Sequence, residues 1–373
     1  MRVAIIHPWF PQYRKPFFDE LVKLGKAKNI DIEIFHGSPP PEWKERGDSV
    51  SHPDATALRT HFFSFGRKNF VFKSLNELWR RPAYDVLVLE QAVRNLETYL
   101  LMLHRRNAAL AFWGHGRTYT QPVGKLQERI KSIMTNRADW FFSYTKGGAD
   151  AVVGSGFNPD HVTIVQNSID SQQLRSSVGE VTDSELEHFA KRNDLRGKTG
   201  LFIGGLDQSK RLDFLIESGQ QAFEKDQEFR LLIAGAGQLE DWVRECSRKY
   251  PWLIYLGPLF GADKAAAMAA SEVLLMPGRV GLVAVDSFAS STPIITTNWK
   301  WHAPEFEYLR HGINALIVPD DVSSYANCIV STLNDRSLLH SLREGAGDSA
   351  EDYSVSRMAK NFIRGLVAMS GNS

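Results

Sequence analysis

The sequence predicts an α/β protein made of two successive Rossmann-like domains, each with a doubly wound parallel sheet. Short apolar runs of strand length alternate with helical patterns in both halves of the chain, and this alternation favours right-handed βαβ units. A polar stretch without strand candidates separates the two halves. At 373 residues, the chain is also longer than one hydrophobic core ordinarily supports.

The first half predicts an N-terminal domain over residues 1–172. Its strand candidates are short apolar or β-branched runs, as buried parallel strands require. The expected strands are Val3–His7, Asp31–His36, His61–Phe65, Val86–Glu90, Ala109–Trp113 and Trp140–Tyr144. The expected helices are Lys15–Lys26, Leu75–Arg81, Leu96–Arg106 and Leu126–Thr135.

Residues 173–198 are polar, and we interpret them as the join between the domains. The alternation then resumes and predicts a C-terminal domain over residues 199–352, followed by a helix within 353–373. The expected strands are Thr199–Ile203, Phe229–Ala234, Trp252–Leu256, Glu272–Met276, Pro293–Thr297 and Ala315–Val318. The expected helices are Leu212–Phe223, Leu239–Tyr250, Asp263–Ala270, Leu282–Ser290, Val322–Leu333 and Val355–Met369.

The composition is that of a globular enzyme, with 43% hydrophobic and 23% charged residues. No apolar run is long enough to span a bilayer, and no secretion signal precedes the first strand candidate, so we expect a cytoplasmic protein. Cys246 and Cys328 offer neither a disulfide framework nor a zinc site, which fits a reducing compartment.

Charge is divided unevenly along the chain. Residues 1–172 hold 23 Lys and Arg against 17 Asp and Glu, a balance of +6, whereas the remainder holds 21 against 26, a balance of −5. The pairs Arg67-Lys68, Arg80-Arg81 and Arg105-Arg106 suit phosphorylated acceptors or a peripheral contact with the inner face of a membrane, or they are ordinary solvated helix surface. Both interpretations stay open, and we expect no nucleic-acid partner.

The most informative motifs follow strands of the second half, at the point where each strand ends. Gly204 and Gly205 follow the strand Thr199–Ile203, and Lys210 and Arg211 come just before a helix. Glycines let the backbone approach a ligand closely, while the two cations supply charge and donors for a diphosphate. The alternative for the cations is solvation of a helix end, which the helix dipole disfavours.

Three further turns fall at the same expected edge of the sheet, where doubly wound sheets bind ligands. Backbone N–H groups at a helix start can bind a phosphate, and a carboxylate can accept both ribose hydroxyls. Each glycine taken alone is also compatible with an ordinary strand–helix turn. The residues assigned here to a donor site are Gly235, Pro258, Leu259, Arg279, Val280, Gly281, Leu282 and Asp286.

These motifs resemble the donor domain of glycosyltransferase family 4. The resemblance rests on Phe202–Lys210, Leu232–Gly237, Leu256–Leu259, Leu275–Thr297 and the earlier segment Ile164–Asp170. It implies the GT-B fold, with the C-terminal helix returning to the N-terminal domain. It also implies sugar transfer with retention from a nucleotide-diphosphate sugar, a UDP- or GDP-sugar, with Lys210 on the diphosphate and Asp286 on the ribose.

Three positions depart from that family's pattern. Gly205 replaces the usual Arg, Gly278 replaces the earlier of two paired glutamates, and the later glutamate is Asp286. We expect Arg279 or Arg211 to restore the missing positive charge. The departures leave nucleotide-sugar binding supported, but they weaken any account of how the sugar hydroxyls are recognised.

The first half is expected to bind the acceptor. No Gly-x-Gly-x-x-Gly follows the first strand, which argues against a dinucleotide cofactor. His115 stands between two glycines at a strand end and resembles the family histidine that touches the donor sugar, although a lone histidine is more often structural. The expected acceptor-binding residues are Tyr13, Arg14, Arg94 and Asn167.

The expected chemistry needs no metal and no cofactor. The sequence contains no Asp-x-Asp, so fixed positive charge from Lys210, an arginine and helix N-termini would neutralise the departing diphosphate. By the resemblance, His115, Lys210 and Asp286 are the catalytic residues. A nucleotide-sugar epimerase or a catalytically silent partner subunit of the same fold are the alternatives. The acceptor stays open between a glycan, a lipid-linked molecule and a small molecule.

Overall fold

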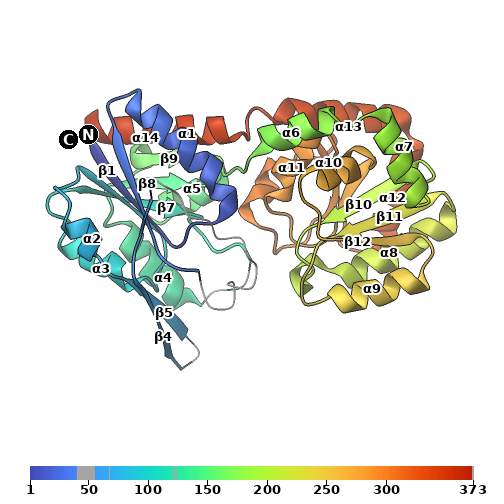
Figure 1. Ribbon diagram of the computed structural model, residues 1–373. Coiled ribbons are helices and arrows are strands. Elements are labelled where there is room, and N and C mark those ends of the chain that lie inside the picture. The colour runs from blue at the N-terminus through green and yellow to red at the C-terminus, as the bar shows by residue number, and fades with distance from the viewer. Residues whose placement is uncertain (40–54, 67, 121, 123, 372–373) are drawn as a thin grey trace. The chain divides into compact units, whose positions relative to one another are not determined.

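The computed structural model describes residues 1–39, 55–66, 68–120, 122 and 124–371 and divides into two units (Figure 1). Unit 1 comprises Met1–Ile169 and Val355–Ser373, and unit 2 comprises Asp170–Ser354. Both units are α/β with parallel sheets, so the predicted fold class is confirmed. Arg67 of the basic pair Arg67-Lys68 lies outside the described residues.

Unit 1 is built on a seven-stranded parallel sheet in the order β3-β2-β1-β6-β7-β8-β9. The strands are β1 (Arg2–His7), β2 (Asp31–His36), β3 (Ala55–Ala57), β6 (Val86–Glu90), β7 (Ala109–Gly114), β8 (Trp140–Ser143) and β9 (Val162–Ile164). The helices are α1 (Lys15–Lys26), α2 (Asn76–Trp79), α3 (Leu96–Leu103), α4 (Lys125–Thr135), α5 (Lys146–Gly154) and α14 (Val355–Gly371).

The prediction of a main-sheet strand over 61–65 is wrong. Those residues fall in β4 (Thr60–Phe65), which pairs with β5 (Lys68–Lys73) as a separate antiparallel hairpin. Gly66 adopts a φ of +59°, a left-handed conformation that glycine allows at low cost in a tight turn. The chain therefore folds back on itself after β4 and does not enter the sheet.

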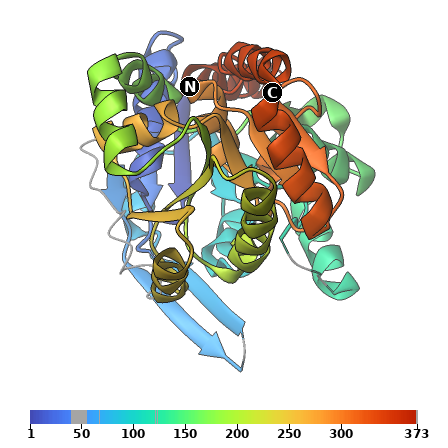
Figure 2. The ribbon, with the colours of Figure 1, turned by 90° about the vertical axis from the view of Figure 1, so that its right-hand side faces the viewer.

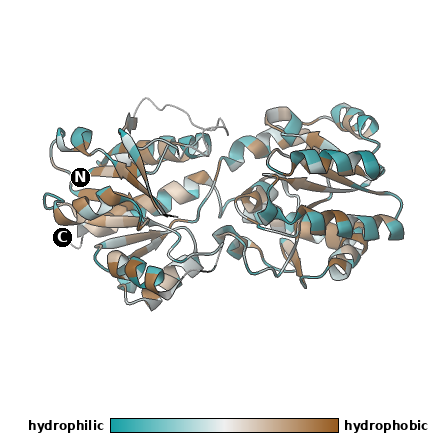
Figure 3. Cartoon of the chain, turned by 90° about the horizontal axis from the view of Figure 1, so that it is seen from below, coloured by the Kyte–Doolittle hydropathy of each residue, from teal (hydrophilic) through white to brown (hydrophobic). Residues whose placement is uncertain are grey.

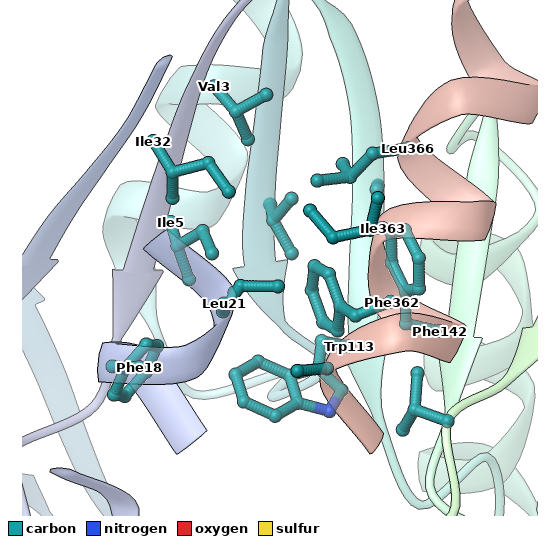
Figure 4. Close-up of a cluster of buried hydrophobic side chains, with 14 of the residues drawn as sticks. Val3, Ile5, Phe18, Leu21, Ile32, Trp113, Phe142, Phe362, Ile363 and Leu366 are labelled. Carbon is teal, nitrogen blue, oxygen red and sulfur yellow. The ribbon is translucent and has the colours of Figure 1, made fainter. Parts of the chain in front are cut away.

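The two faces of the unit 1 sheet bury separate apolar clusters. Figure 4 shows the cluster that α1 and α14 cover. On one face α1 and α14 pack together over residues such as Ile5 and Trp113, and the ring of Phe362 stacks on Phe142 at 4.1 Å. Gly365 is required there, because a Cβ would lie 2.4 Å from the Phe142 ring. The last helix of the chain thus completes the core of the first unit.

Unit 2 has a six-stranded parallel sheet in the order β12-β11-β10-β13-β14-β15, with helices on both faces (Figure 2). The strands are β10 (Lys198–Ile203), β11 (Phe229–Ala234), β12 (Leu253–Gly257), β13 (Val273–Met276), β14 (Ile294–Thr297) and β15 (Ala315–Val318). The helices are α6 (Ser171–Gly179), α7 (Asp183–Arg192), α8 (Leu212–Lys225), α9 (Glu240–Lys249), α10 (Gly261–Ala269), α11 (Val283–Ser290), α12 (Val322–Asn334) and α13 (Arg336–Ser349).

Residues 173–198 are not the join that we expected. They form most of α6, the whole of α7 and the start of β10, and α6 packs against α10 and α11 inside unit 2. Thr182 and Glu185 form a capping box at the start of α7, a signal that the polar composition concealed. The boundary of unit 2 therefore lies at Asp170, whose side chain accepts a hydrogen bond from Gln173 N at 3.1 Å and caps α6.

Candidate functional site

The strand order of unit 2 places a switch point at β10, whose neighbours β11 and β13 lead the chain in opposite directions across the sheet. Ligands bind beyond the carboxyl ends of strands at such points. The loop after β10 is shaped by Asp207, whose Oδ1 accepts a hydrogen bond from Ser209 N at 2.8 Å. The short helix that ends at Lys210 follows directly, so this lysine stands at the switch point.

Lys210 joins the loop after β10 to the loop after β13. Its Nζ donates a hydrogen bond to Arg279 O at 2.8 Å, and Arg279 N donates to Ser209 O at 2.8 Å. Burial lowers the pKa of Lys210, the carboxylates of Asp207 and Glu305 raise it, and Arg279 lowers it. The arrangement fixes one partly buried cation at the edge where the sequence predicted the diphosphate.

Two glycines allow the loops of this edge to approach so closely. A Cβ at Gly235, where φ is +144°, would lie 1.8 Å from Gly204 O. A Cβ at Gly278 would lie 2.5 Å from the carbonyl carbon and oxygen of Lys210 and 2.6 Å from Ser209 O. Gly278 is thus the position against which the Lys210 backbone packs, which explains why no glutamate stands there.

His302 holds the loop after β13, and sequence reasoning missed it. Its Nδ1 accepts a hydrogen bond from Val280 N at 3.1 Å, its Nε2 lies 2.9 Å from Thr297 O, and its ring stacks on Phe306. Burial and then the charge of Lys210 lower the pKa of His302 to about 4, although the bond to Thr297 opposes the shift. The neutral ring therefore uses the Val280 N–H, which corrects the expectation that this group is free for a phosphate.

Arg211 is also committed within the chain. Its guanidinium donates a hydrogen bond to Asp320 and lies 4.4 Å from the Phe214 ring and 5.6 Å from the Trp299 ring. The ion pair with Asp320 occupies the guanidinium that we expected to supply charge to a diphosphate, so this role of Arg211 stays a prediction. The backbone of Arg279 is hydrogen-bonded to Ser209 and Lys210 at this edge, and its Nε donates to Trp301 O at 3.4 Å.

Asp286 lies in α11 and forms an ion pair with Lys264 of α10, with 2.9 Å between Nζ and Oδ1. Burial raises the pKa of Asp286, and Lys264 lowers it. The pair leaves the second carboxylate oxygen for another partner. Lys264 did not emerge from the sequence, because nothing along the chain connects it with Asp286.

The other predicted donor residues lie around the same edge. Gly205 and Pro258 are exposed, Leu259 is half-buried, and Gly281 and Leu282 precede α11. Glu305, which lies in no motif that stands out in the sequence, is only 3% exposed, and its Oε2 lies 3.8 Å from the place of a Cβ at Gly281. Its signal was its position after β14, whose carboxyl end lies at this edge too.

In unit 1, His115 follows β7 and packs on Tyr144, with ring centroids 4.6 Å apart. Its side chain reaches solvent, while burial and then the charges of Lys131 and Arg14 lower its pKa to about 4. A Cβ at Gly116 would lie 2.1 Å from Gly148 O, so the start of α5 packs tightly against the His115 loop. The ring is therefore a neutral imidazole held at the carboxyl edge of the sheet.

The predicted acceptor residues separate into two groups. Arg14 is only 3% exposed and its guanidinium packs over the rings of Tyr13, Trp113 and Tyr144, so its expected contact with an acceptor stays a prediction. Asn167 is buried beside them, with its N–H donating to Tyr144 O, and Tyr13 is exposed. Arg94 lies elsewhere, next to β5, where its carbonyl accepts from Val71 N.

Two absences hold for the part of the chain that the structure describes. Within it, no three His, Cys, Asp or Glu side chains gather as a metal site. The same residues include no helix with the length and apolarity to cross a bilayer.

Comparison with known proteins shows which sequences this chain resembles. The family model for glycosyl transferases group 1 matches residues 197–335. The phosphatidyl-myo-inositol mannosyltransferase of Mycobacterium leprae is 26% identical over 184 residues, which cover 47% of this chain and 48% of that protein. The glycogen synthase of Mycobacterium tuberculosis is 22% identical over 262 residues, 68% of this chain and 59% of that protein. The chain spans about half the length of the mannosyltransferases that it matches.

Solved structures extend the likeness to the whole fold. HepE of Anabaena, crystallised in complex with UDP, superposes with a TM-score of 0.71 at 13% identity, over 99% of this chain and 100% of that chain. A glycosyltransferase from Rickettsia africae gives a TM-score of 0.72 at 14% identity, over 100% of this chain and 99% of that one. The chain therefore has the GT-B fold of glycosyltransferases, and its second unit carries the sequence pattern of glycosyl transferases group 1.

Proposed function

We propose that the protein is a retaining, metal-independent glycosyltransferase that moves a sugar from a UDP- or GDP-sugar to a hydroxyl acceptor in glycan or glycolipid synthesis. The observation that carries the proposal is Lys210, a partly buried cation held between the loops after β10 and β13. The match to glycosyl transferases group 1 covers these loops, and HepE, a neighbour in fold, was crystallised with UDP.

Lys210 would stabilise the departing diphosphate. Charge develops on the leaving oxygen as the bond from the anomeric carbon breaks, and a preorganised cation lowers the energy of that state. The acceptor oxygen bonds to the anomeric carbon from the same face, and its proton passes to the diphosphate. No side chain then has to act as a nucleophile.

Asp286 and Glu305 would contact the rest of the donor. The second oxygen of Asp286 can accept from a ribose hydroxyl, and the charge of Lys264 opposes the rise in the pKa of this carboxyl that burial causes. Glu305 supplies a second carboxylate near Gly281, at an edge where Gly278 leaves the family position without one. We assign His115 to the sugar as a neutral hydrogen-bonding group, since its pKa is lowered to about 4.

A catalytically silent partner subunit is the second candidate. Two groups that the sequence offered to a diphosphate, Val280 N–H and the Arg211 guanidinium, are already bonded within unit 2. A silent protein would keep the fold and could still bind a nucleotide. Only turnover separates the two candidates.

The deciding experiment measures release of nucleoside diphosphate from UDP-glucose, UDP-N-acetylglucosamine and GDP-mannose, with and without lipid and glycan acceptors. We expect turnover with one donor, and a loss of at least tenfold in Lys210→Ala, because a hydrogen bond to a charged group is worth about 1.5–3 kcal/mol. Lys191→Ala, an exposed lysine of α7, is the matched control. Tight nucleotide binding without turnover of any donor supports the silent subunit instead.

A further inference from the structure

A cavity of about 270 Å³ lies in unit 1 beside the loop that carries His115. Gln91, which follows β6, and Gly116 and Arg117, which follow β7, line one side of it. The other lining residues belong to α4, to α5 and to Ser155, directly after α5. We call it the α4–α5 cavity.

Helices α4 and α5 pack on the same face of the sheet. Met134 of α4 and Val152 of α5 belong to one buried cluster, on the side opposite α1 and α14. The two helices are also joined by hydrogen bonds, because Ser132 Oγ and Asn136 Nδ2 donate to Ser155 O at 3.4 and 2.8 Å. Figure 3 looks on to this face from below, where hydrophilic and hydrophobic residues alternate along the helices. The core therefore fixes two walls of the cavity.

The third wall is tied to α4 at two places. Gln91 Oε1 accepts a hydrogen bond from Gly116 N at 3.1 Å, and Gln91 Nε2 donates to Thr135 Oγ1 at 2.8 Å. Thr118 Oγ1 donates to Glu128 Oε1 at 3.2 Å. The loop after β7 is thus held against the helix before any ligand arrives, and a preorganised site loses less free energy on binding.

The lining of the α4–α5 cavity is positively charged. Arg117, Arg129 and Lys131 are cations, and Glu128 is the one carboxylate among the described residues that line it, a balance of +2. Burial lowers the pKa of Lys131, and the Glu128 carboxylate opposes this shift without cancelling it. The cavity therefore holds more positive charge than the chain neutralises.

This charge and these donors suit a phosphate group. Guanidinium and ammonium groups form strong, charge-assisted hydrogen bonds with phosphate oxygens. A phosphate monoester carries a charge of about −1.5 to −2 at neutral pH and three acceptor oxygens, so it balances the cations of the cavity. An uncharged hydroxyl compound would leave that charge unbalanced.

We propose that the α4–α5 cavity binds the phosphate group of a phosphorylated acceptor, which Lys131 and Arg129 contact. The inference rests on the proposed transferase function, because only that function gives the protein an acceptor. A phosphate held beside Gly116 and Arg117 keeps the rest of the acceptor next to His115, at the carboxyl edge of the sheet. The cavity would thus select hydroxyl compounds whose phosphate lies near the hydroxyl that receives the sugar.

Occupation of the cavity should also change His115. After burial, the charge of Lys131 is the next cause that lowers the pKa of His115, followed by the charge of Arg14. A phosphate bound to Lys131 would offset that charge, so the pKa of His115 should rise from about 4 when the cavity is filled. A lysine with a purely structural role would not link His115 to a phosphate in this way.

The test is calorimetric titration of the full chain with glycerol 3-phosphate, with glycerol as the match that lacks the phosphate. We expect binding of the phosphate ester alone, weakened by salt. Dihexanoyl phosphatidylglycerol tests the same chemistry in a lipid headgroup. Binding of either phosphate compound supports the proposal, and the tighter of the two identifies the acceptor as a soluble ester or a lipid. Binding of neither overturns it.

Variants locate the site. Lys131→Gln should weaken binding of glycerol 3-phosphate roughly tenfold, and Arg129→Gln, at an exposed position, roughly fivefold. Lys191→Gln of α7 and Arg248→Gln of α9 are the matched controls, both at exposed positions, and should bind like the unaltered chain. Thermal unfolding of every variant shows whether it is folded.

Three outcomes would contradict the proposal. Equal affinity in folded Lys131→Gln, Arg129→Gln and the controls places the phosphate elsewhere. Loss of binding in Lys210→Ala, with Lys131→Gln unaffected, assigns the phosphate to unit 2. A pKa of His115 that glycerol 3-phosphate leaves unchanged, followed by NMR titration, removes the link between the cavity and His115. None of these measurements needs turnover, so their failure is distinct from failure of the transferase assignment.

Discussion

Gly278→Ala should destabilise unit 2, whereas Gly281→Ala, three residues away in the same loop, should not. A Cβ at position 278 would meet the carbonyl group of Lys210 at 2.5 Å and Ser209 O at 2.6 Å. A Cβ at position 281 would meet its nearest neighbours, Ala303 Cβ and Glu305 Oε2, at 3.5 and 3.8 Å, which are ordinary contacts. The two substitutions add the same methyl group to different spaces.

The magnitude follows from what has to move. The atoms that crowd position 278 belong to the backbone, so they cannot turn aside as a flexible side chain could, and overpacking of this kind costs about 1–3 kcal/mol. Ser209 O also accepts the hydrogen bond from Arg279 N, and a displaced loop would weaken that bond by about 1 kcal/mol. We expect a total of roughly 2–4 kcal/mol for Gly278→Ala, and between no change and a gain of about 1 kcal/mol for Gly281→Ala.

Urea unfolding of the two variants measures these free energies, and calorimetric titration with UDP and GDP measures the consequence for Lys210. The displaced loop should lower nucleotide diphosphate affinity in Gly278→Ala. Equal unfolding free energies for the two alanine variants would refute the claim that the Lys210 backbone packs on Gly278. A gain of activity in Gly278→Glu would refute it as well, since a longer side chain needs even more room.

Four further outcomes are expected. His115→Ala should depress turnover strongly while leaving the affinity for bare nucleotide diphosphate and the melting temperature nearly unchanged, and a parallel fall of all three would make it a scaffold residue. Activity should survive excess EDTA, and loss that manganese or magnesium restores would contradict the fixed-charge mechanism. Lys264→Met should destabilise unit 2 by roughly 1–3 kcal/mol, because it leaves the partly buried Asp286 carboxylate without its cation. Adding Asp286→Asn should recover part of that loss, and a double-mutant cycle without recovery would show that the two residues are not coupled. The folded-state pKa of His302 is about 4, below the usual 6.5, so neutral His302 contributes roughly 3 kcal/mol to the free energy of unfolding above about pH 6.5 and this contribution is lost as the pH falls toward 4. His302→Gln should remove this pH dependence from urea unfolding curves recorded across that range.

The parallel sheets could be predicted because their strands are buried on both faces and therefore stand out as short apolar runs. The hairpin β4–β5 could not be distinguished from such a strand by its composition, since β4 carries exposed phenylalanines that mimic a buried run. The helices α6 and α7 were missed for the opposite reason. Most of their residues face water, so their polar composition concealed the few side chains, such as Phe189, that anchor them.

The site could be predicted where its chemistry lies in one loop. Lys210 follows a glycine turn after a strand, and this local pattern is enough to place it at the sheet edge. Partners from distant segments could not be predicted. Arg211 and Asp320 are separated by 109 positions and Val280 and His302 by 22, so only the folded sheet shows that these groups are already bonded.

The helix α14 has a consequence for how the protein is made. Unit 2 is a continuous stretch of chain, whereas unit 1 needs Phe362 and Leu366 to close the core that begins at Val3. During translation, unit 2 is synthesised before α14, so the apolar side chains of residues 1–169 on the α1 side of the sheet stay uncovered until then. The first part of the chain to leave the ribosome is thus among the last to be completed, and a nascent chain that stalls before residue 355 exposes a core that chaperones would recognise.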